Sequence, residues 1–244
     1  MFCDIDGTLA PIVERAADAR VPRETSDLLG ALARRFAVVG CLSGRRAVEA
    51  RELAGRDDLV YIGNHGFERL LPGEDEAAHD PALHGHETTT VDFLEHYDSA
   101  ELGRAGLRLE DKGPIRAFHW RGADDESEAE ARARELAMAA VERNLVAHWG
   151  RKVLEIRPAV ELNKGTALAE LLEEREIANA LYGGDDRTDV DAFRKLRDMR
   201  TTGDLRAAVC IGVASPEGPP EVIEEADAVV DGPVGFVDAL RMLE

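Results

Sequence analysis

The chain has 244 residues, of which 44% are hydrophobic and 5% are aromatic, and its formal net charge is -19. This length is sufficient for one large hydrophobic core or two modest ones. The excess of negative charge excludes nucleic acid and anionic membranes as partners, and an anionic substrate would need a local cation or a metal ion in order to bind.

Strands and helices alternate in the first and last parts of the chain. Buried strands are expected at residues 2–3, 36–42, 59–62, 179–182, 207–211 and 228–230, and helices at residues 23–35, 164–176 and 189–196, with a further helix starting after residue 45. The strands are apolar throughout, which is typical of parallel strands that are covered on both faces. The alternation predicts an α/β fold in which both parts share one doubly wound parallel sheet.

The middle of the chain has a different pattern. Longer strands are expected at residues 105–112, 115–121, 145–149 and 152–157, and helices at residues 88–97 and 126–143. We therefore expect an inserted α+β domain at residues 67–157, between two core segments at residues 1–66 and 158–244. The polar stretch at residues 72–87 holds three irregularly spaced histidines, which favours a solvated loop over a metal site.

Side chains along the inserted strands alternate between apolar and polar, so each strand has two different faces. Phe118 and Trp120 alternate with His119 and Arg121, and the same alternation occurs at residues 107–112 and 154–157. The apolar side is expected to pack under the helices. The charged side is either a solvated face, which is common in antiparallel sheets, or a surface that recognises a polyhydroxylated substrate.

The three cysteines, Cys3, Cys41 and Cys210, each lie in a short apolar run. Their odd number and scattered spacing predict neither a disulfide framework nor a zinc site, and they indicate buried reduced thiols. The sequence contains no recognisable signal peptide and no apolar stretch that approaches the roughly 20 residues of a membrane span. We therefore expect a cytoplasmic protein, and we expect it to be a monomer.

Two carboxylates follow the first strand, in the segment Asp4-Ile5-Asp6-Gly7-Thr8. Oxygen ligands of this kind suit Mg²⁺. Asp4 is a candidate nucleophile for attack on phosphorus, and Asp6 is a candidate acid and base. Taken alone, the segment is also compatible with a plain loop or a calcium-binding turn.

Two further candidate segments lie at helix starts. The Ser43 hydroxyl and the backbone N–H groups at Gly44 and Arg45 could grip a phosphate, although a simple N-cap serine has the same pattern. Lys164 could neutralise phosphate charge, although a solvated surface lysine is the alternative.

Residues 184–193 carry four aspartates within seven positions. So many neighbouring carboxylates repel one another, and an acidic helix N-terminus offsets only part of that repulsion. A bound divalent cation accounts for the cluster better, with Asp185 and Asp189 as the candidate ligands.

The order of these four segments resembles the haloacid dehalogenase superfamily, and the resemblance extends over both core segments. It implies a Rossmann-like doubly wound parallel core with an inserted α+β cap, a Mg²⁺ cofactor and an aspartyl-phosphate formed on Asp4. It also implies that Asp6 acts as acid and base, and that Ser43 and Lys164 bind the phosphate. Asp185 would bind the metal. Asp189 would be a further ligand, or it would contact a ligand without binding the metal itself.

Finer details resemble the trehalose-6-phosphate phosphatases, at residues 6–12, 63–66, 110–112, 119–121, 155–158, 163–165 and 184–193. In that family, charged cap residues hold the glucose away from the phosphate. The predicted site is catalytic at Asp4 and Asp6, phosphate-binding at Thr8, Ser43, Gly44 and Lys164, substrate-binding at Arg45, His65, Lys112, His119, Arg121 and Glu155, and metal-binding at Asp4, Asp6, Asp185 and Asp189.

The resemblance implies hydrolysis of trehalose 6-phosphate to trehalose and phosphate, the last step of trehalose biosynthesis, with a small-molecule sugar phosphate as the partner. The alternatives are a phosphatase for mannosyl- or glucosyl-phosphoglycerate, sucrose phosphate or a hexose phosphate, a sugar phosphomutase, and a non-catalytic module that binds sugar phosphates. Two features depart from the family. Only three residues precede Asp4, which makes the first strand short, and residues 190–192 are Val-Asp-Ala where Glu-Asp-Met is commoner.

Overall fold

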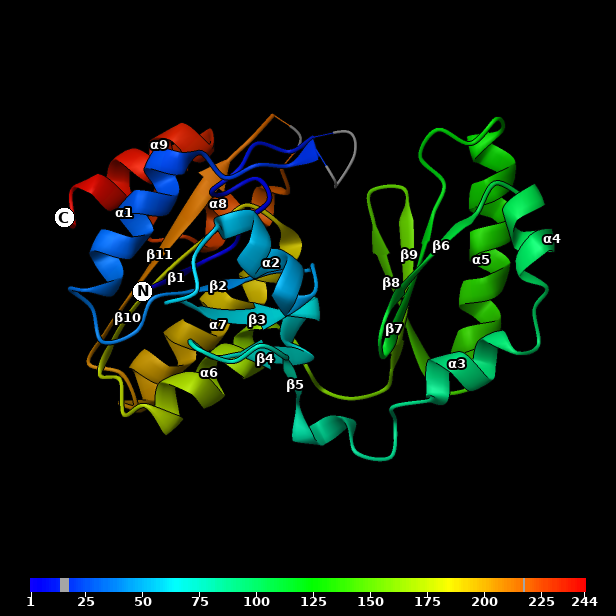
Figure 1. Cartoon of the computed structure of the whole chain (residues 1–244), viewed down its shortest axis with the longest axis horizontal. Helices are drawn as coiled ribbons and strands as arrows, with labels where there is room; N and C mark the ends of the chain where they lie inside the picture. The colour runs from blue at the N-terminus through cyan, green and yellow to red at the C-terminus, as the bar shows by residue number, and fades with distance from the viewer. Residues whose placement is uncertain (14–17, 217) are drawn as a thin grey trace. The chain divides into compact units, whose positions relative to one another are not determined.

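The computed structural model describes residues 1–13, 18–216 and 218–244. The chain divides into two compact units (Figure 1). The core unit comprises Met1–Asp80 and Leu162–Glu244, and the inserted unit comprises Pro81–Glu161. Within the described residues, no helix has both the length and the apolar character needed to cross a lipid bilayer.

A sheet with the strand order β12-β11-β10-β1-β2-β3-β4-β5 forms the centre of the core unit. Its strands are β1 (Phe2–Cys3), β2 (Gly40–Leu42), β3 (Val60–Gly63), β4 (Glu68–Leu70), β5 (Ala78–His79), β10 (Asn179–Gly184), β11 (Ala207–Ala214) and β12 (Ala228–Asp231). The six strands from β12 to β3 are parallel, whereas β4 and β5 run antiparallel at one edge. The predicted α/β fold with a doubly wound parallel sheet is thus confirmed, and the short strand β1 lies inside the sheet.

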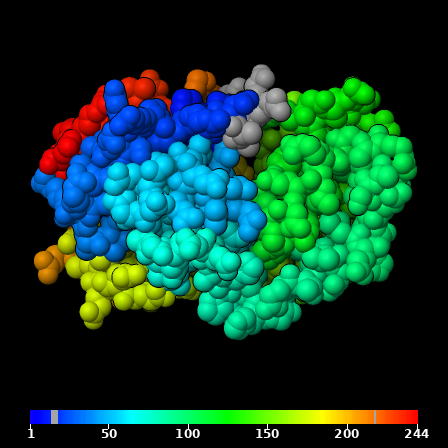
Figure 2. Space-filling model, in the orientation of Figure 1, coloured from blue at the N-terminus to red at the C-terminus, as the bar shows by residue number. Residues whose placement is uncertain are grey.

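Helices cover both faces of this sheet (Figure 1). One layer contains α1 (Arg23–Ala33), α2 (Ala47–Ala54) and α9 (Gly232–Arg241), and the other contains α6 (Lys164–Glu174), α7 (Arg187–Thr202) and α8 (Pro220–Glu225). The first layer buries Leu29, Leu32 and Phe236, and the second buries Leu168 and Phe193. In the space-filling view, the first and last helices, α1 and α9, lie side by side on the surface of the core unit (Figure 2, blue and red).

The inserted unit contains an antiparallel sheet with the order β6-β7-β9-β8. Its elements are α3 (Thr89–Leu94), α4 (Ser99–Arg104), β6 (Arg108–Lys112), β7 (Ile115–His119), α5 (Glu126–Glu142), β8 (Leu145–Gly150) and β9 (Val153–Pro158). The three helices pack on one face of the sheet, where Phe93, Leu102, Phe118, Leu136 and Leu154 form a buried cluster (Figure 1).

Several details differ from the sequence-based expectations. Residues 67–80 belong to the core unit, because β4 pairs with β3 and β5 pairs with β4. The unit boundaries therefore fall after residues 80 and 161, whereas residues 66 and 157 were expected. The strand expected at residues 36–42 starts only at Gly40, and α4 was not expected. Leu109 pairs with Phe118 and so lies on the packed face, as expected, but its position on the edge strand β6 leaves it 40% exposed.

The three cysteines are buried and unpaired, as expected. Cys3 and Cys41 lie opposite each other on β1 and β2. Two short 3-10 turns, η2 (Asn64–Gly66) and η3 (Pro81–Leu83), follow β3 and β5. The turn η2 brings His65 back beside the end of β2, since the His65 amide donates to the Ser43 carbonyl at 3.0 Å.

Candidate active site

Several predicted site residues meet where the central parallel strands end. Asp4 directly follows β1, and its amide donates to the carbonyl of Gly183 in β10 at 2.9 Å. Asp185 directly follows β10, and Ser43 directly follows β2. Because the carboxyl ends of parallel strands lie along the same edge, three distant parts of the chain contribute to one site, as expected for an open α/β sheet.

Lys164 joins two of the carboxylates. Its ammonium group donates to Asp4 Oδ1 at 2.9 Å and to Asp189 Oδ1 at 2.7 Å. Asn163 caps α6 in a capping box with Thr166, which places Lys164 as the first helical residue. Lys164 is only 1% exposed, so the alternative of a solvated surface lysine is wrong. A fully buried ammonium needs such partners, because an unpaired buried charge is strongly destabilising.

Asp189 is held from several sides. Its Oδ1 accepts from the Tyr182 hydroxyl at 2.6 Å, and its Oδ2 accepts from the backbone N–H groups of Asp185 and Asp186 at 3.0 and 3.1 Å. Asp186 in turn caps α7 by accepting from the N–H groups of Thr188 and Asp189. Neither Tyr182 nor the capping role of Asp186 was predicted from the sequence. The Asp-x-x-Asp spacing is a helix-start signal that could have revealed the second.

Asp4, Asp185 and Asp189 form a buried carboxylate group. One oxygen atom from each lies within 4.8 Å of the others. The pKa of Asp185 is raised to about 8, first by burial and then by the neighbouring carboxylates of Asp189 and Asp186. Burial also raises the pKa of Asp189 to about 6 and that of Asp4 well above its usual range, against the opposing effect of Lys164. One lysine therefore does not fully compensate three carboxylates, and the oxygen donor set suits a hard divalent cation.

Two glycines allow the backbone to approach this group. A Cβ atom at Gly7, which has a φ of +89°, would lie 2.1 Å from Asp185 Oδ2. A Cβ atom at Gly184 would lie 2.2 Å from Asp189 Cγ. Next to Gly7, the buried hydroxyl of Thr8 donates to Asp185 Oδ1 at 3.1 Å. The predicted phosphate ligand Thr8 therefore contacts the candidate metal ligand Asp185 in this structure.

Asp6 lies apart from the buried carboxylates and is paired with Arg45. The Arg45 Nε atom donates to Asp6 Oδ2 at 2.6 Å, and a terminal nitrogen of the guanidinium group donates to Asp6 Oδ1 at 2.7 Å. The side chain of Asp6 is 34% exposed, and that of Arg45 is 18% exposed. This two-point contact orients the carboxylate and joins the segment after β1 to the segment after β2.

The loop at residues 43–45 brings together four predicted residues. Ser43 is 1% exposed, and its Oγ accepts from the Arg45 N–H at 3.2 Å. A Cβ atom at Gly44 would lie 2.6 Å from the His65 ring, so only glycine leaves room for this imidazole. His65 itself has a left-handed backbone with a φ of 58°. The structure therefore places Ser43, Gly44, Arg45 and His65 next to one another.

The inserted unit carries a separate charged cluster on the side of its sheet that faces away from the helices. The Lys112 ammonium donates to Glu155 Oε1 at 3.0 Å, and the guanidinium of Arg157 binds the other oxygen of Glu155. His119 contacts Glu110 at 2.6 Å, and this hydrogen bond lowers the pKa of Glu110.

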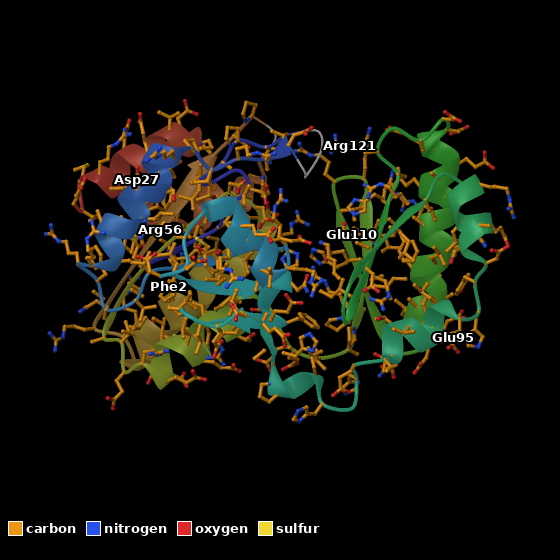
Figure 3. All side chains as sticks on the ribbon, in the orientation of Figure 1. Phe2, Asp27, Arg56, Glu95, Glu110 and Arg121 are labelled. Atoms are coloured by element: carbon orange, nitrogen blue, oxygen red, sulfur yellow. The ribbon has the colours of Figure 1, made fainter. Side chains whose placement is uncertain are left out.

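Arg121 does not join this cluster. β7 ends at His119, so the period-two alternation does not extend as far as residue 121. Arg121 is exposed in the turn that precedes α5, and Figure 3 shows it well away from Glu110. Within the inserted unit, Lys112, His119 and Glu155 thus lie on one face, and Arg121 lies beyond its end.

Comparisons with known proteins agree on the family. The family model described as trehalose-phosphatase matches residues 2–217. A rice protein (Oryza sativa subsp. japonica), named as a probable trehalose-phosphate phosphatase 4, is 34% identical over 214 residues, which is 81% of this chain and 55% of that protein. The chain thus spans little more than half the length of this curated relative.

Solved structures show the same fold. A trehalose-6-phosphate phosphatase related protein superposes with a TM-score of 0.77 at 22% identity, covering 99% of this chain and 95% of that one. The C-terminal domain of the trehalose-6-phosphate phosphatase of C. albicans gives a TM-score of 0.75 at 23% identity, covering 99% and 90%. Since the family model matches most of the sequence, the chain belongs to the trehalose-phosphatase family.

Proposed function

We propose that this protein hydrolyses trehalose 6-phosphate to trehalose and phosphate through an aspartyl-phosphate on Asp4. The observation that carries the proposal is the position of Asp4, which is buried beside Lys164 and two further carboxylates, with Asp6 two residues along the chain. A buried nucleophile, an adjacent cation and a nearby acid are the groups that phosphoryl transfer by a carboxylate requires. The substrate follows from the family to which the chain belongs.

Mg²⁺ is the metal that fits the donor set best. Asp4 and Asp185 would hold it together with the main-chain carbonyl of Asp6, and Asp189 completes the buried carboxylate group. Three carboxylates with raised pKa values are poorly compensated by Lys164 alone, and carboxylate oxygens without thiol or imidazole ligands suit Mg²⁺. When bound, the ion would neutralise charge on the phosphoryl oxygens.

The side chains of the core unit would carry out the remaining steps. A carboxylate oxygen of Asp4 attacks phosphorus, and the bond between phosphorus and the sugar oxygen breaks. Asp6 gives a proton to the departing sugar oxygen, then takes a proton from the water that attacks the aspartyl-phosphate. Lys164, the Ser43 hydroxyl and the backbone of Gly44 would hold the phosphoryl oxygens in place. Arg45 has to release Asp6 before Asp6 can carry the proton, and a released guanidinium is well suited to bind phosphate.

The charged face of the inserted unit would select the sugar. Lys112, Glu155 and His119 offer donors and acceptors that match hydroxyl groups, and they lie on a sheet face without covering helices. Burial of Glu155 between two cations gives it a fixed orientation. Fixed polar groups discriminate strongly between sugars, because a substrate that lacks one hydroxyl leaves a partner unpaired.

Phosphate release from a panel of substrates tests this function. Trehalose 6-phosphate, glucose 6-phosphate, sucrose 6-phosphate and glucosyl-phosphoglycerate would be compared with Mg²⁺ and with EDTA. The proposal expects a strong preference for trehalose 6-phosphate that is lost in EDTA. Metal-dependent release from another sugar phosphate would support the chemistry and refute the substrate. An isomerised sugar phosphate without free phosphate would indicate a phosphomutase.

A further inference from the structure

Glu68 is a buried carboxylate that the proposed mechanism does not use. It is the first residue of β4, and it is only 1% exposed. A carboxylate at such a site is destabilising unless charged or polar partners surround it. The identity of its partners therefore indicates which part of the protein Glu68 organises.

Among the described residues, the side-chain carboxylate of Glu68 contacts segments that flank the loop at residues 43–45. Its Oε2 accepts from the Ala47 N–H, the first amide of α2, at 3.0 Å. Its Oε1 accepts from the Asn64 side-chain amide at 2.8 Å and lies 3.6 Å from the Nε atom of Arg46. One carboxylate thus binds the segment that leaves the loop and the turn that packs against it.

The turn η2 transmits this constraint to the loop. The Asn64 N–H donates to the Arg45 carbonyl at 2.7 Å, and the His65 N–H donates to the Ser43 carbonyl at 3.0 Å. Asn64 and His65 both have left-handed backbones, with φ values of 50° and 58°. Two successive non-glycine residues in this region are strained and persist only when their surroundings hold them. The bond from Asn64 to Glu68 is one such restraint.

We propose that Glu68 is a positioning residue for phosphate binding, which acts through Asn64 to fix the loop at residues 43–45. This inference rests on the proposed function, since that function assigns the loop to the phosphate. Glu68 itself does not touch the substrate. It sets the backbone of Ser43 and Arg45, and Arg45 in turn pairs with Asp6.

A purely structural role would have different consequences. It would lower the free energy of unfolding, while the folded fraction of a variant would bind phosphate with the normal Kd. A positioning role changes the Kd of the folded protein. The two roles are therefore separated by measuring the Kd for inorganic phosphate in the presence of Mg²⁺, together with the folded fraction from urea denaturation.

The contact between Glu68 and Asn64 allows a swap experiment. Asn64→Asp places two carboxylates against each other, and Glu68→Gln removes the charge that accepts the amide. The double variant, Glu68→Gln with Asn64→Asp, restores one donor and one acceptor at the same contact and keeps the net charge. Aspartate, like asparagine, tolerates the left-handed backbone at position 64. The matched control is Glu174→Gln, which breaks the ion pair to the neighbouring β4 residue Arg69 (2.5 Å) on the protein surface.

The expected result is a Kd for phosphate that rises about tenfold or more in Asn64→Asp, rises less in Glu68→Gln and returns most of the way in the double variant. KM for the sugar phosphate should change in parallel, while Mg²⁺ affinity and the Glu174→Gln control stay at wild-type values. Normal Kd values in both folded single variants would overturn the proposal, as would a double variant with no recovery. If the wild type binds phosphate but releases none from any sugar phosphate, the proposed function fails and the Kd test of Glu68 still decides this inference.

Discussion

Replacing Lys164 with methionine tests the buried charge cluster in the metal-free protein. Methionine has a similar length, so the change removes the ammonium and leaves most of the packing of α6. In the wild type this ammonium lies 2.9 Å from Asp4 and 2.7 Å from Asp189, and all three side chains are nearly inaccessible to solvent. Removing one partner from a buried ion pair typically costs about 3–5 kcal/mol of stability. We expect a loss of that order for Lys164→Met near neutral pH.

The pH dependence of this loss has a definite sign. Burial raises the pKa of Asp189 and Asp4, and Lys164 opposes the rise in both. Without the lysine, both pKa values rise further above their unfolded values of about 4. The folded variant then binds more protons than the unfolded chain, so its stability falls as the pH rises above about 4. The deficit relative to wild type should therefore be larger near pH 8 than near pH 5.

Urea denaturation in EDTA, near pH 5 and near pH 8, measures the free energy of unfolding of the variant and of the wild type. With Mg²⁺ present, the same variant should release no measurable phosphate from trehalose 6-phosphate at either pH, because the phosphate loses the cation that lies beside Asp4. Equal stability of variant and wild type at both pH values would refute the argument, since it would mean that the buried carboxylates do not need the lysine. A deficit that is larger at the lower pH would also contradict it.

Three further predictions concern binding and catalysis. Arg45→Ala should lower kcat/KM by about tenfold to a hundredfold, because the guanidinium that would bind the phosphate after releasing Asp6 is lost, and an unchanged ratio in steady-state assays would contradict this. Lys112→Ala should raise KM for trehalose 6-phosphate by about tenfold. It should leave KM for p-nitrophenyl phosphate unchanged, because Lys112 and Glu155 are proposed to contact only the sugar. Because the pKa of Asp185 is raised to about 8, Mg²⁺ has to displace a proton at lower pH. The Kd for Mg²⁺, measured by calorimetry, should therefore be lower at about pH 8 than at about pH 6, and binding at the lower pH should release a proton. A Kd that does not depend on pH would refute the assignment of Asp185 as a ligand.

Local patterns were sufficient to predict most of the secondary structure. The apolar runs identified the parallel strands, and period-two alternation correctly placed Phe118, Leu154 and Ile156 in the core of the inserted unit. The same rule put Leu109 on the correct face but did not predict its 40% exposure, because alternation does not show how far an edge strand is covered. It failed at Arg121, where the strand had already ended.

The charge state and burial of individual site residues were harder to predict. Taken alone, Lys164 has the pattern of a surface lysine, and its burial is explained by its partners Asp189 and Asp4, the latter 160 positions away. Glu68 is followed by the charged Arg69 and its local sequence does not indicate burial, yet it is buried against the start of α2. Contacts of this kind depend on tertiary structure, which the local sequence does not encode. Motif order predicted the ends of the strands, where the candidate site lies, and the geometry added Tyr182 and Asp186.

The position of the phosphorylated residue tests the central claim most directly. Wild-type protein would be mixed with trehalose 6-phosphate and Mg²⁺, quenched in acid within the first turnover and digested for mass spectrometry, with Asp4→Asn treated in the same way. The account predicts a phosphate on the peptide that contains Asp4, and it predicts neither a phosphopeptide nor turnover in the folded variant. Normal phosphate release by Asp4→Asn, or a phosphate on a different residue, would contradict it.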